Sequence, residues 1–186
     1  MMKQLYLIRH CSAEGQEAEA SLTKEGRNQA VQLANTLGFV PFDKLYSSPF
    51  RRATQSIEPL ALALDKPITI DDRLSERKLT AEPIDNWLEE LEKTFNDPSY
   101  KLGGGESSEE AACRGLEVLE EAIQHTKEVA LLMTHGNLLT LLLRHFESSL
   151  GFDTWKSLTN PDIYCLTFKD DCYESMKHIN LERQGL

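Results

Sequence analysis

The sequence has no apolar run that approaches the ~20 residues required to span a membrane. The stretch from Met1 to Leu7 also lacks the pattern of a secretory signal, in which a charged region precedes a long apolar core. There are only four cysteines, with no CxxC pair and no regular spacing. A chain of this size can bury a core without covalent links, so we expect reduced thiols in a cytoplasmic protein with no membrane association.

Basic residues are also scarce. The chain has 20 Lys and Arg against 30 Asp and Glu, which gives a formal net charge of −10. Nucleic acids and anionic membranes are bound through basic surfaces, so we expect neither as a partner. A small anionic substrate is compatible with this charge, because a few arginines that converge in one cleft create a local positive potential.

The residues that are present predict one α/β domain over residues 1–186. Apolar patterns predict six strands, at residues 3–9, 43–47, 68–70, 128–134, 163–168 and 173–178. Helical periodicity and capping residues predict four helices, at residues 23–38, 49–64, 107–125 and 137–146. The third of these helices fits a capping box, and Pro49 is expected at the first position of the second. This alternation predicts a three-layer α/β/α sandwich whose mostly parallel central sheet has an antiparallel edge.

One segment, at about residues 74–105, does not fit the alternation of strands and helices. It holds two prolines, charged amphipathic pieces around Trp87 to Phe95, and the run Gly103-Gly104-Gly105. We interpret it as an insertion that forms a lid over one end of the sheet. Trp87 and Phe95 are candidates for the wall of a specificity pocket.

Two histidines and two arginines follow the buried strands. His10 ends the first strand and His135 follows the strand at 128–134, with Arg9 beside His10 and Arg52 shortly after the strand at 43–47. The carboxyl ends of parallel strands meet at the edge where α/β proteins bind ligands, and helix N-termini there offer N–H groups to anions. Arginine binds phosphate through two parallel hydrogen bonds. The pattern therefore predicts a phosphate pocket that contains a nucleophile.

These residues lie within segments that resemble, in the correct order, the motifs of the histidine phosphatase (phosphoglycerate mutase-like) superfamily. Leu7-Ile8-Arg9-His10 resembles the opening strand and RH motif of that superfamily. The other matching segments are residues 22–30, 47–56, 74–77, 104–107 and 134–137. Each motif alone is weak, whereas the ordered set is specific and spans about three quarters of the chain. The resemblance implies a phosphoglycerate mutase-like fold.

The resemblance also implies a role for each site residue. His10 matches the nucleophile that becomes phosphohistidine, and Arg9, Arg52 and His135 match the residues that hold the phosphoryl oxygens. Glu76 matches the proton donor of the leaving alcohol. Since histidine and arginine perform this chemistry where other phosphatases use metal ions, we expect no metal and no cofactor.

The chain departs from the superfamily pattern after the RH pair. Cys11 stands where glycine is usual, and Gln16 stands where asparagine is frequent. The Gln16 side chain is longer than that of asparagine, and its amide is the candidate for the phosphate contact of this loop. The Cys11 side chain either packs away from the pocket or lies near its cationic groups, where its pKa would fall and its reactivity would rise.

The predicted function is hydrolysis of a small phosphomonoester. The alternatives are a mutase, which returns the phosphoryl group to another hydroxyl of the substrate, and a non-catalytic module that binds a phosphorylated ligand. Mutases of the superfamily have a larger lid than residues 74–105 provide, which favours the phosphatase. The sequence leaves open the substrate and whether the protein is a monomer or a homodimer.

Overall fold

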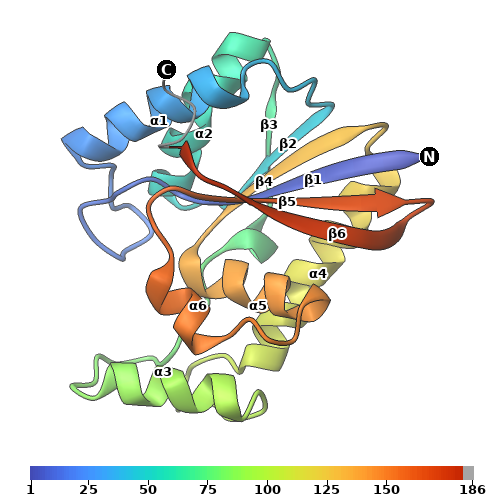
Figure 1. The fold of residues 1–186 in the computed structure, drawn as a ribbon. Coiled ribbons are helices and arrows are strands. Elements are labelled where there is room, and N and C mark those ends of the chain that lie inside the picture. The colour runs from blue at the N-terminus through green and yellow to red at the C-terminus, as the bar shows by residue number, and fades with distance from the viewer. Residues whose placement is uncertain (182–186) are drawn as a thin grey trace.

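Two buried strands form the centre of the sheet in the computed structural model, which describes residues 1–181. β1 (Met2–Arg9) pairs in parallel with β4 (Val129–Thr134), and β4 pairs in parallel with β2 (Lys44–Ser47). The described strands follow the order β3-β2-β4-β1-β5-β6 (Figure 1). β3 (Ile68–Ile70) is the parallel edge.

The opposite edge is a hairpin of β5 (Asp162–Lys169) and β6 (Cys172–Ile179), and β5 runs antiparallel to β1. The prediction of a mostly parallel sheet with an antiparallel edge is therefore confirmed.

Alternate residues of the central strands enter two separate cores. Leu5 and Leu7 of β1 pack beneath α4 (Ser108–His125) and α5 (Gly136–Phe146). Tyr6 and Ile8 pack on the other face, against α1 (Lys24–Leu37) and α2 (Arg51–Leu64). Figure 1 shows these helix pairs on opposite sides of the sheet. The three-layer sandwich is confirmed, and burial on both faces explains the consecutive apolar residues at 5–8 of β1 and in β4.

Most helix ends follow the predicted capping residues. Thr23 caps α1 by accepting a hydrogen bond from the Gly26 N–H, and Ser107 forms a capping box with Glu110 at the start of α4. The prediction for Pro49 was wrong, because α2 begins at Arg51. The Phe50 N–H instead donates a hydrogen bond to the Ser48 hydroxyl at 3.2 Å, and Pro49 and Phe50 lie outside the helix.

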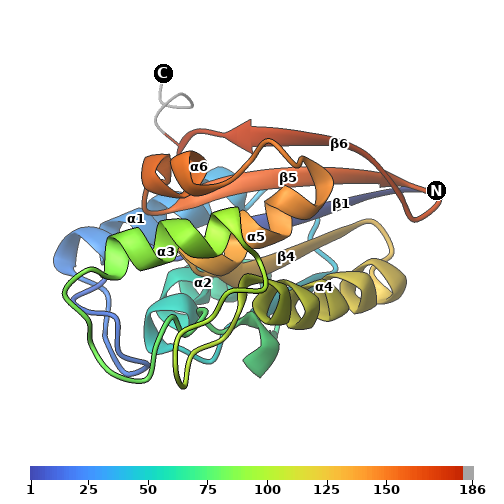
Figure 2. The same cartoon turned by 90° about the horizontal axis from the view of Figure 1, so that it is seen from below.

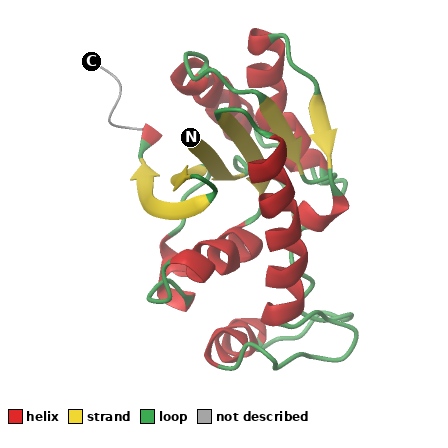
Figure 3. Cartoon of the chain, turned by 90° about the vertical axis from the view of Figure 1, so that its right-hand side faces the viewer, coloured by secondary structure: helices red, strands yellow, loops and turns green. Residues whose placement is uncertain are grey.

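The segment interpreted as a lid contains α3 (Trp87–Asn96) and lies on the α5 side of the sheet. In Figures 1 and 3, α3 lies at the bottom of the molecule, farther from the sheet than α5. Two short elements were not predicted: a 3-10 turn, η1 (Asp72–Leu74), and α6 (Phe152–Ser157). Figure 2 shows α3, α5 and α6 together on this side, where the Phe95 and Phe152 rings lie 6.0 Å apart.

Within residues 1–181, no helix combines the length and the apolarity that a membrane span requires.

Candidate active site

The register of the two central strands brings the two histidines together. Arg9 is paired with Thr134, so the residues that follow them leave the sheet side by side. The His10 N–H donates to the Thr134 carbonyl at 2.9 Å, and the His10 and His135 rings lie 5.1 Å apart at 62°. Both histidines are buried, with exposed fractions of 7% and 0%.

Hydrogen bonds fix the tautomer of His10. Its Nδ1 lies 2.7 Å from the Cys11 carbonyl oxygen, which can only accept, so Nδ1 carries the proton. Its Nε2 therefore holds a lone pair, and the Arg52 Nε–H donates to it at 3.1 Å. Nε2 is therefore the candidate nucleophile, and it must give up the Arg52 hydrogen bond in order to react.

Burial keeps the His10 ring neutral. It lowers the pKa of His10 to about 3, opposed by the Cys11 carbonyl and assisted by the charges of Arg52 and Arg9. Burial likewise lowers the pKa of His135 well below its usual value, with His10 and the arginines adding to the effect. Neither ring therefore carries a charge near neutral pH in the free protein.

Arg52 is held in the first turn of α2 and is 1% exposed. Its Nη1 donates to the carbonyls of Gln16 at 3.1 Å and Glu17 at 2.8 Å, which ties the loop after β1 to the site. Its guanidinium carbon lies 4.9 Å from the centre of the Phe50 ring. Burial lowers the pKa of Arg52, but a guanidinium stays charged in proteins. The adjacent Arg51 is exposed.

Arg9 reaches the site from the end of β1. Its Nη1 donates to the Leu158 carbonyl at 3.1 Å and to the Thr159 carbonyl at 3.3 Å. Its buried Nε has no partner among the described residues. A Cβ on Gly136 would lie 3.1 Å from this Nε, so the glycine of the Thr134-His135-Gly136 motif leaves room for the guanidinium.

His135 is oriented by a residue to which the sequence analysis gave no role. The Ser48 Oγ lies 2.7 Å from His135 Nε2, and the Phe50 ring packs edge-on against the imidazole at 4.9 Å. The buried Nδ1 of His135 has no partner within the described chain. Ser48 and Phe50 both lie in the segment 47–56 that resembles a superfamily motif, which was the available signal.

Glu76 occupies the N-terminus of α5. Its carboxylate accepts the N–H groups of Asn137 at 3.0 Å and Leu138 at 3.1 Å, and also its neighbour Arg77's N–H at 2.9 Å. The expectation that helix N-termini here are open to an anion is therefore wrong for α5, because the protein's own carboxylate fills this position.

These residues surround a cavity of about 370 Å³. Its polar lining includes Arg9, His10, Gln16 and Glu76. The buried Arg52 donates a hydrogen bond to His10, and the buried His135 packs against the His10 ring. The structure thus brings together all six predicted site residues. The remaining lining residues are Arg77, Leu79, Trp87, Leu91, Gly136, Asn137 and Trp155.

The Cys11 side chain packs away from this cavity. It is 0% exposed and lies among Leu22, Ala30 and Ala13, while its N–H donates to the Ser56 hydroxyl at 2.9 Å. Burial raises the pKa of the Cys11 thiol to about 11, so the alternative of a reactive thiol with a lowered pKa is wrong. Cys11 does not have a positive φ, so this position does not need the glycine that the superfamily usually has.

Three further contributions to the site were not predicted. The Asn160 amide donates to the His10 carbonyl at 2.7 Å, and nothing in the local sequence indicated this contact. Trp155 lines the cavity from α6, and Arg77 lines it beside Glu76. Of the two pocket candidates in the lid segment, Trp87 lines the cavity, whereas Phe95 is 2% exposed and belongs to the core.

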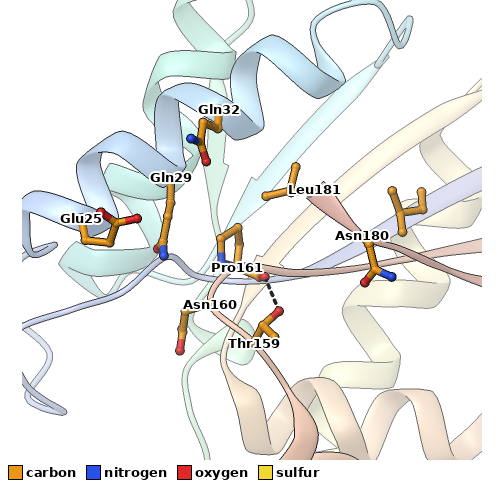
Figure 4. Close-up of a pocket in the computed structure, with 9 residues that line it drawn as sticks. Glu25, Gln29, Gln32, Thr159, Asn160, Pro161, Asn180 and Leu181 are labelled. Carbon is orange, nitrogen blue, oxygen red and sulfur yellow. Dashed lines mark hydrogen bonds between the residues drawn. The ribbon is translucent and has the colours of Figure 1, made fainter. Parts of the chain in front are cut away.

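A second cavity, of about 360 Å³, lies between α1 and the loop that carries Asn160 (Figure 4). Glu25, Gln29 and Gln32 of α1 face Thr159 and Pro161 across it. Its described lining residues include a carboxylate and no arginine, lysine or histidine, so it lacks the positive charge that a phosphate group requires.

Among residues 1–181, no three His, Cys, Asp or Glu side chains are grouped so that they could hold a metal ion.

Comparisons with known proteins match the chain over most of its length. A sequence profile of the histidine phosphatase superfamily (branch 1) matches residues 5–181. A putative phosphoserine phosphatase 2 of Hydrogenobacter thermophilus is 29% identical over 153 residues, which are 74% of this chain and 75% of that protein. A probable phosphoglycerate mutase of Salmonella choleraesuis is 26% identical over 172 residues, or 83% and 78% of the two chains. The solved structure of a mycobacterial glucosyl-3-phosphoglycerate phosphatase has a TM-score of 0.75 at 21% identity, and the match covers 96% of this chain and 97% of that one.

Proposed function

Because the chain belongs to the histidine phosphatase superfamily, we propose that it hydrolyses a small phosphomonoester through a phosphohistidine at His10. The observation that carries the proposal is the orientation of the buried, neutral His10 ring, whose Nδ1 proton is held by the Cys11 carbonyl. This arrangement leaves Nε2 as the nucleophile at the cavity. Relatives named as phosphatases support the same reaction class.

In the first step, His10 Nε2 attacks phosphorus, an N–P bond forms, and the ester P–O bond breaks. Negative charge on the phosphoryl oxygens is stabilised by the guanidinium groups of Arg9 and Arg52. Arg9 lines the cavity, and Arg52 donates to His10 Nε2. His135 contributes a further hydrogen bond from its unpartnered Nδ1 when that nitrogen carries the ring proton. Gln16, which lines the cavity, is the proposed amide contact to the phosphoryl group.

Glu76 is the proposed proton donor. Its carboxyl group gives a proton to the departing alkoxide, then takes one from the water that attacks phosphohistidine and releases inorganic phosphate. In the free protein three backbone N–H groups donate to the Glu76 carboxylate and hold it in the lining of the cavity.

The segment at about 74–105 is the proposed lid of a single domain. It supplies Glu76, Leu79, Trp87 and Leu91 to the cavity and therefore covers the reacting atoms on one side. We propose that no metal ion is needed, because Arg9 and Arg52 meet the charge of the phosphoryl group and His10 supplies the nucleophile.

The test is hydrolysis of p-nitrophenyl phosphate by the purified protein with a chelator present. We expect turnover that is unaffected by the chelator and that falls by a factor of at least about 10³ in His10→Ala, with wild-type activity in the control His145→Ala. His145 is exposed and lies outside the cavity. Acid-labile ³²P on the wild type, absent from His10→Ala, identifies the intermediate.

The mutase alternative has a distinct outcome in this test. The relative named as a phosphoglycerate mutase keeps it open, and it predicts a long-lived phosphohistidine, weak hydrolysis and dependence on a bisphosphate primer. Hydrolysis that is retained in His10→Ala, or abolished by the chelator, would contradict the proposed mechanism.

A further inference from the structure

The part of the cavity that lies beyond the phosphate-binding residues has an apolar wall. Leu79 and Leu91 contribute aliphatic surface from the lid segment, and Trp87 and Trp155 contribute two indole rings. Trp87 belongs to α3 and Trp155 to α6, so segments about seventy residues apart in the sequence meet at this wall. We refer to these four residues as the apolar wall.

The two indole rings of the apolar wall contact each other. Their centres lie 6.2 Å apart at 81°, an edge-to-face geometry. The Phe152 ring stacks on the Trp155 indole, with ring centres 5.7 Å apart and an angle of 12° between the ring planes. Trp87 is 48% exposed, which is unusual for so large an apolar side chain and leaves its ring available to a ligand.

The charge available beyond the phosphate-binding residues is small. Arg77 is the one further cationic residue in the described lining, and its Nε and Nη1 already donate to the Glu106 carbonyl and the Thr94 hydroxyl. Its buried Nη2 is unpartnered within the described chain. The carboxylates of Glu106 and Glu76 offset its charge. Because Nε and Nη1 are already engaged, Arg77 has one unpartnered nitrogen for an acceptor on a ligand, and it cannot grip a second phosphate group through two nitrogens.

We infer, on the basis of the proposed function, that the preferred substrate is a phosphate ester of an alcohol that carries an aromatic or similarly flat apolar group. The ring packs against the apolar wall, on the exposed Trp87 indole, while the phosphate lies at His10. Aromatic pairs of this kind add to the free energy gained by burying apolar area, and the substrate forms them before and during the chemical step. In the reaction the ester P–O bond breaks and the aromatic alcohol leaves with the proton from Glu76.

The kinetic test compares substrates that all release a primary alcohol, so that leaving-group acidity does not favour the aromatic compound. The panel is benzyl phosphate, glycerol 3-phosphate, phosphoserine and glucose 6-phosphate. We expect kcat/KM for benzyl phosphate to exceed each of the others by at least about tenfold. A sugar phosphate or phosphoserine at the top of the panel would overturn the inference.

Variants of the apolar wall must remove the preference without removing catalysis. In Trp87→Ala and Trp155→Ala we expect kcat/KM for benzyl phosphate to fall about tenfold, against about threefold or less for glycerol 3-phosphate. Phe39→Ala is the matched control, because Phe39 is 93% exposed and lies outside the cavity. The half-exposed Trp87 makes its variant informative even if the loss of Trp155 disturbs α6. An equal fall for both substrates would overturn the inference.

A binding measurement separates this inference from the proposed function. The chain has two tryptophans and both line the cavity, so intrinsic tryptophan fluorescence reports on this wall alone. We expect benzylphosphonate, which cannot be hydrolysed, to shift the emission and to bind at least about tenfold more tightly than methylphosphonate. If no phosphate ester is hydrolysed but this preference is found, the proposed function fails and the subsite stands. If all the esters are hydrolysed and the two phosphonates bind equally, the subsite fails and the function stands.

Discussion

The two buried histidines make the stability of the protein depend on pH in a predictable way. In the folded protein the pKa of His10 is about 3 and that of His135 is also well below its usual value, because both rings are buried. In the unfolded chain a histidine has a pKa of about 6.5. Between these values the unfolded state binds more protons than the folded state. The free energy of unfolding therefore falls as pH decreases through about 6.5 and continues to fall toward about 3.

The size of this effect follows from the linkage relation. Between pH 7.5 and pH 5.5 an unfolded histidine gains most of a proton while the buried ring gains almost none, which costs about 1.4 kcal/mol for each histidine. His10 and His135 together should lower the free energy of unfolding by roughly 2–3 kcal/mol over this interval.

The assay is urea unfolding at the two pH values in buffers free of phosphate, for the wild type, His10→Gln and His135→Gln. Glutamine does not titrate, so each variant should lose about 1.4 kcal/mol of the pH-dependent change, whatever its stability at pH 7.5. A His10→Gln variant whose pH-dependent change equals that of the wild type would show that the ring is not held neutral. The nucleophile assigned from its tautomer would then have to be reconsidered.

Three other predictions follow from single contacts. In Glu76→Gln we expect hydrolysis of an alkyl phosphate to fall by about 10²–10⁴, and that of p-nitrophenyl phosphate much less, because nitrophenolate leaves without a proton; equal losses would contradict proton donation. Gly26→Ala should lower the free energy of unfolding by more than about 2 kcal/mol, because the new Cβ would lie 1.9 Å from the Ser12 carbonyl oxygen. Gly103→Ala, which meets nothing within 4 Å, is its control in the same urea titration. A thiol reagent should modify the exposed Cys113 and Cys172 rapidly, and unfolding should be required before it modifies Cys11 and Cys165.

The sheet and its cores could be predicted because their signals are local. β4 and residues 5–8 of β1 are short runs of consecutive buried residues, and such runs are typical of a sheet covered on both faces. Thr23 and Ser107 carry their capping partners three residues along the chain, so these helix starts were also readable. The prediction for Pro49 failed although proline is frequent in a first helical turn. The Ser48 hydroxyl accepts the Phe50 N–H and holds Phe50 in a turn before the helix.

Some residues of the candidate site could not be predicted from local sequence patterns. The Asn160 contact to the His10 carbonyl spans 150 positions of sequence, and Trp155 belongs to a helix of only six residues that has no clear periodicity. The sequence marks where each strand ends, and ligands bind at that edge of an α/β sheet. This is why Arg9, His10, Arg52 and His135 could be predicted. Trp87 was a candidate because it lies in the predicted lid segment, whereas Trp155 and Asn160 carry no such marker and were identified from the structure.

The buried polar atoms without partners indicate where the fold gives up stability for binding. Five such side-chain atoms occur among the described residues: three belong to Arg9, Arg77 and Asn137, which line the cavity, and a fourth to His135, which packs against His10. A buried donor or acceptor left unpaired typically costs about 1–3 kcal/mol, so this concentration in one place needs a reason. An anionic group in the cavity provides one, because the donors on Arg9 and His135 would then be satisfied by phosphoryl oxygens. The same atoms that weaken the free protein would in this way contribute affinity for the phosphate and for the transition state.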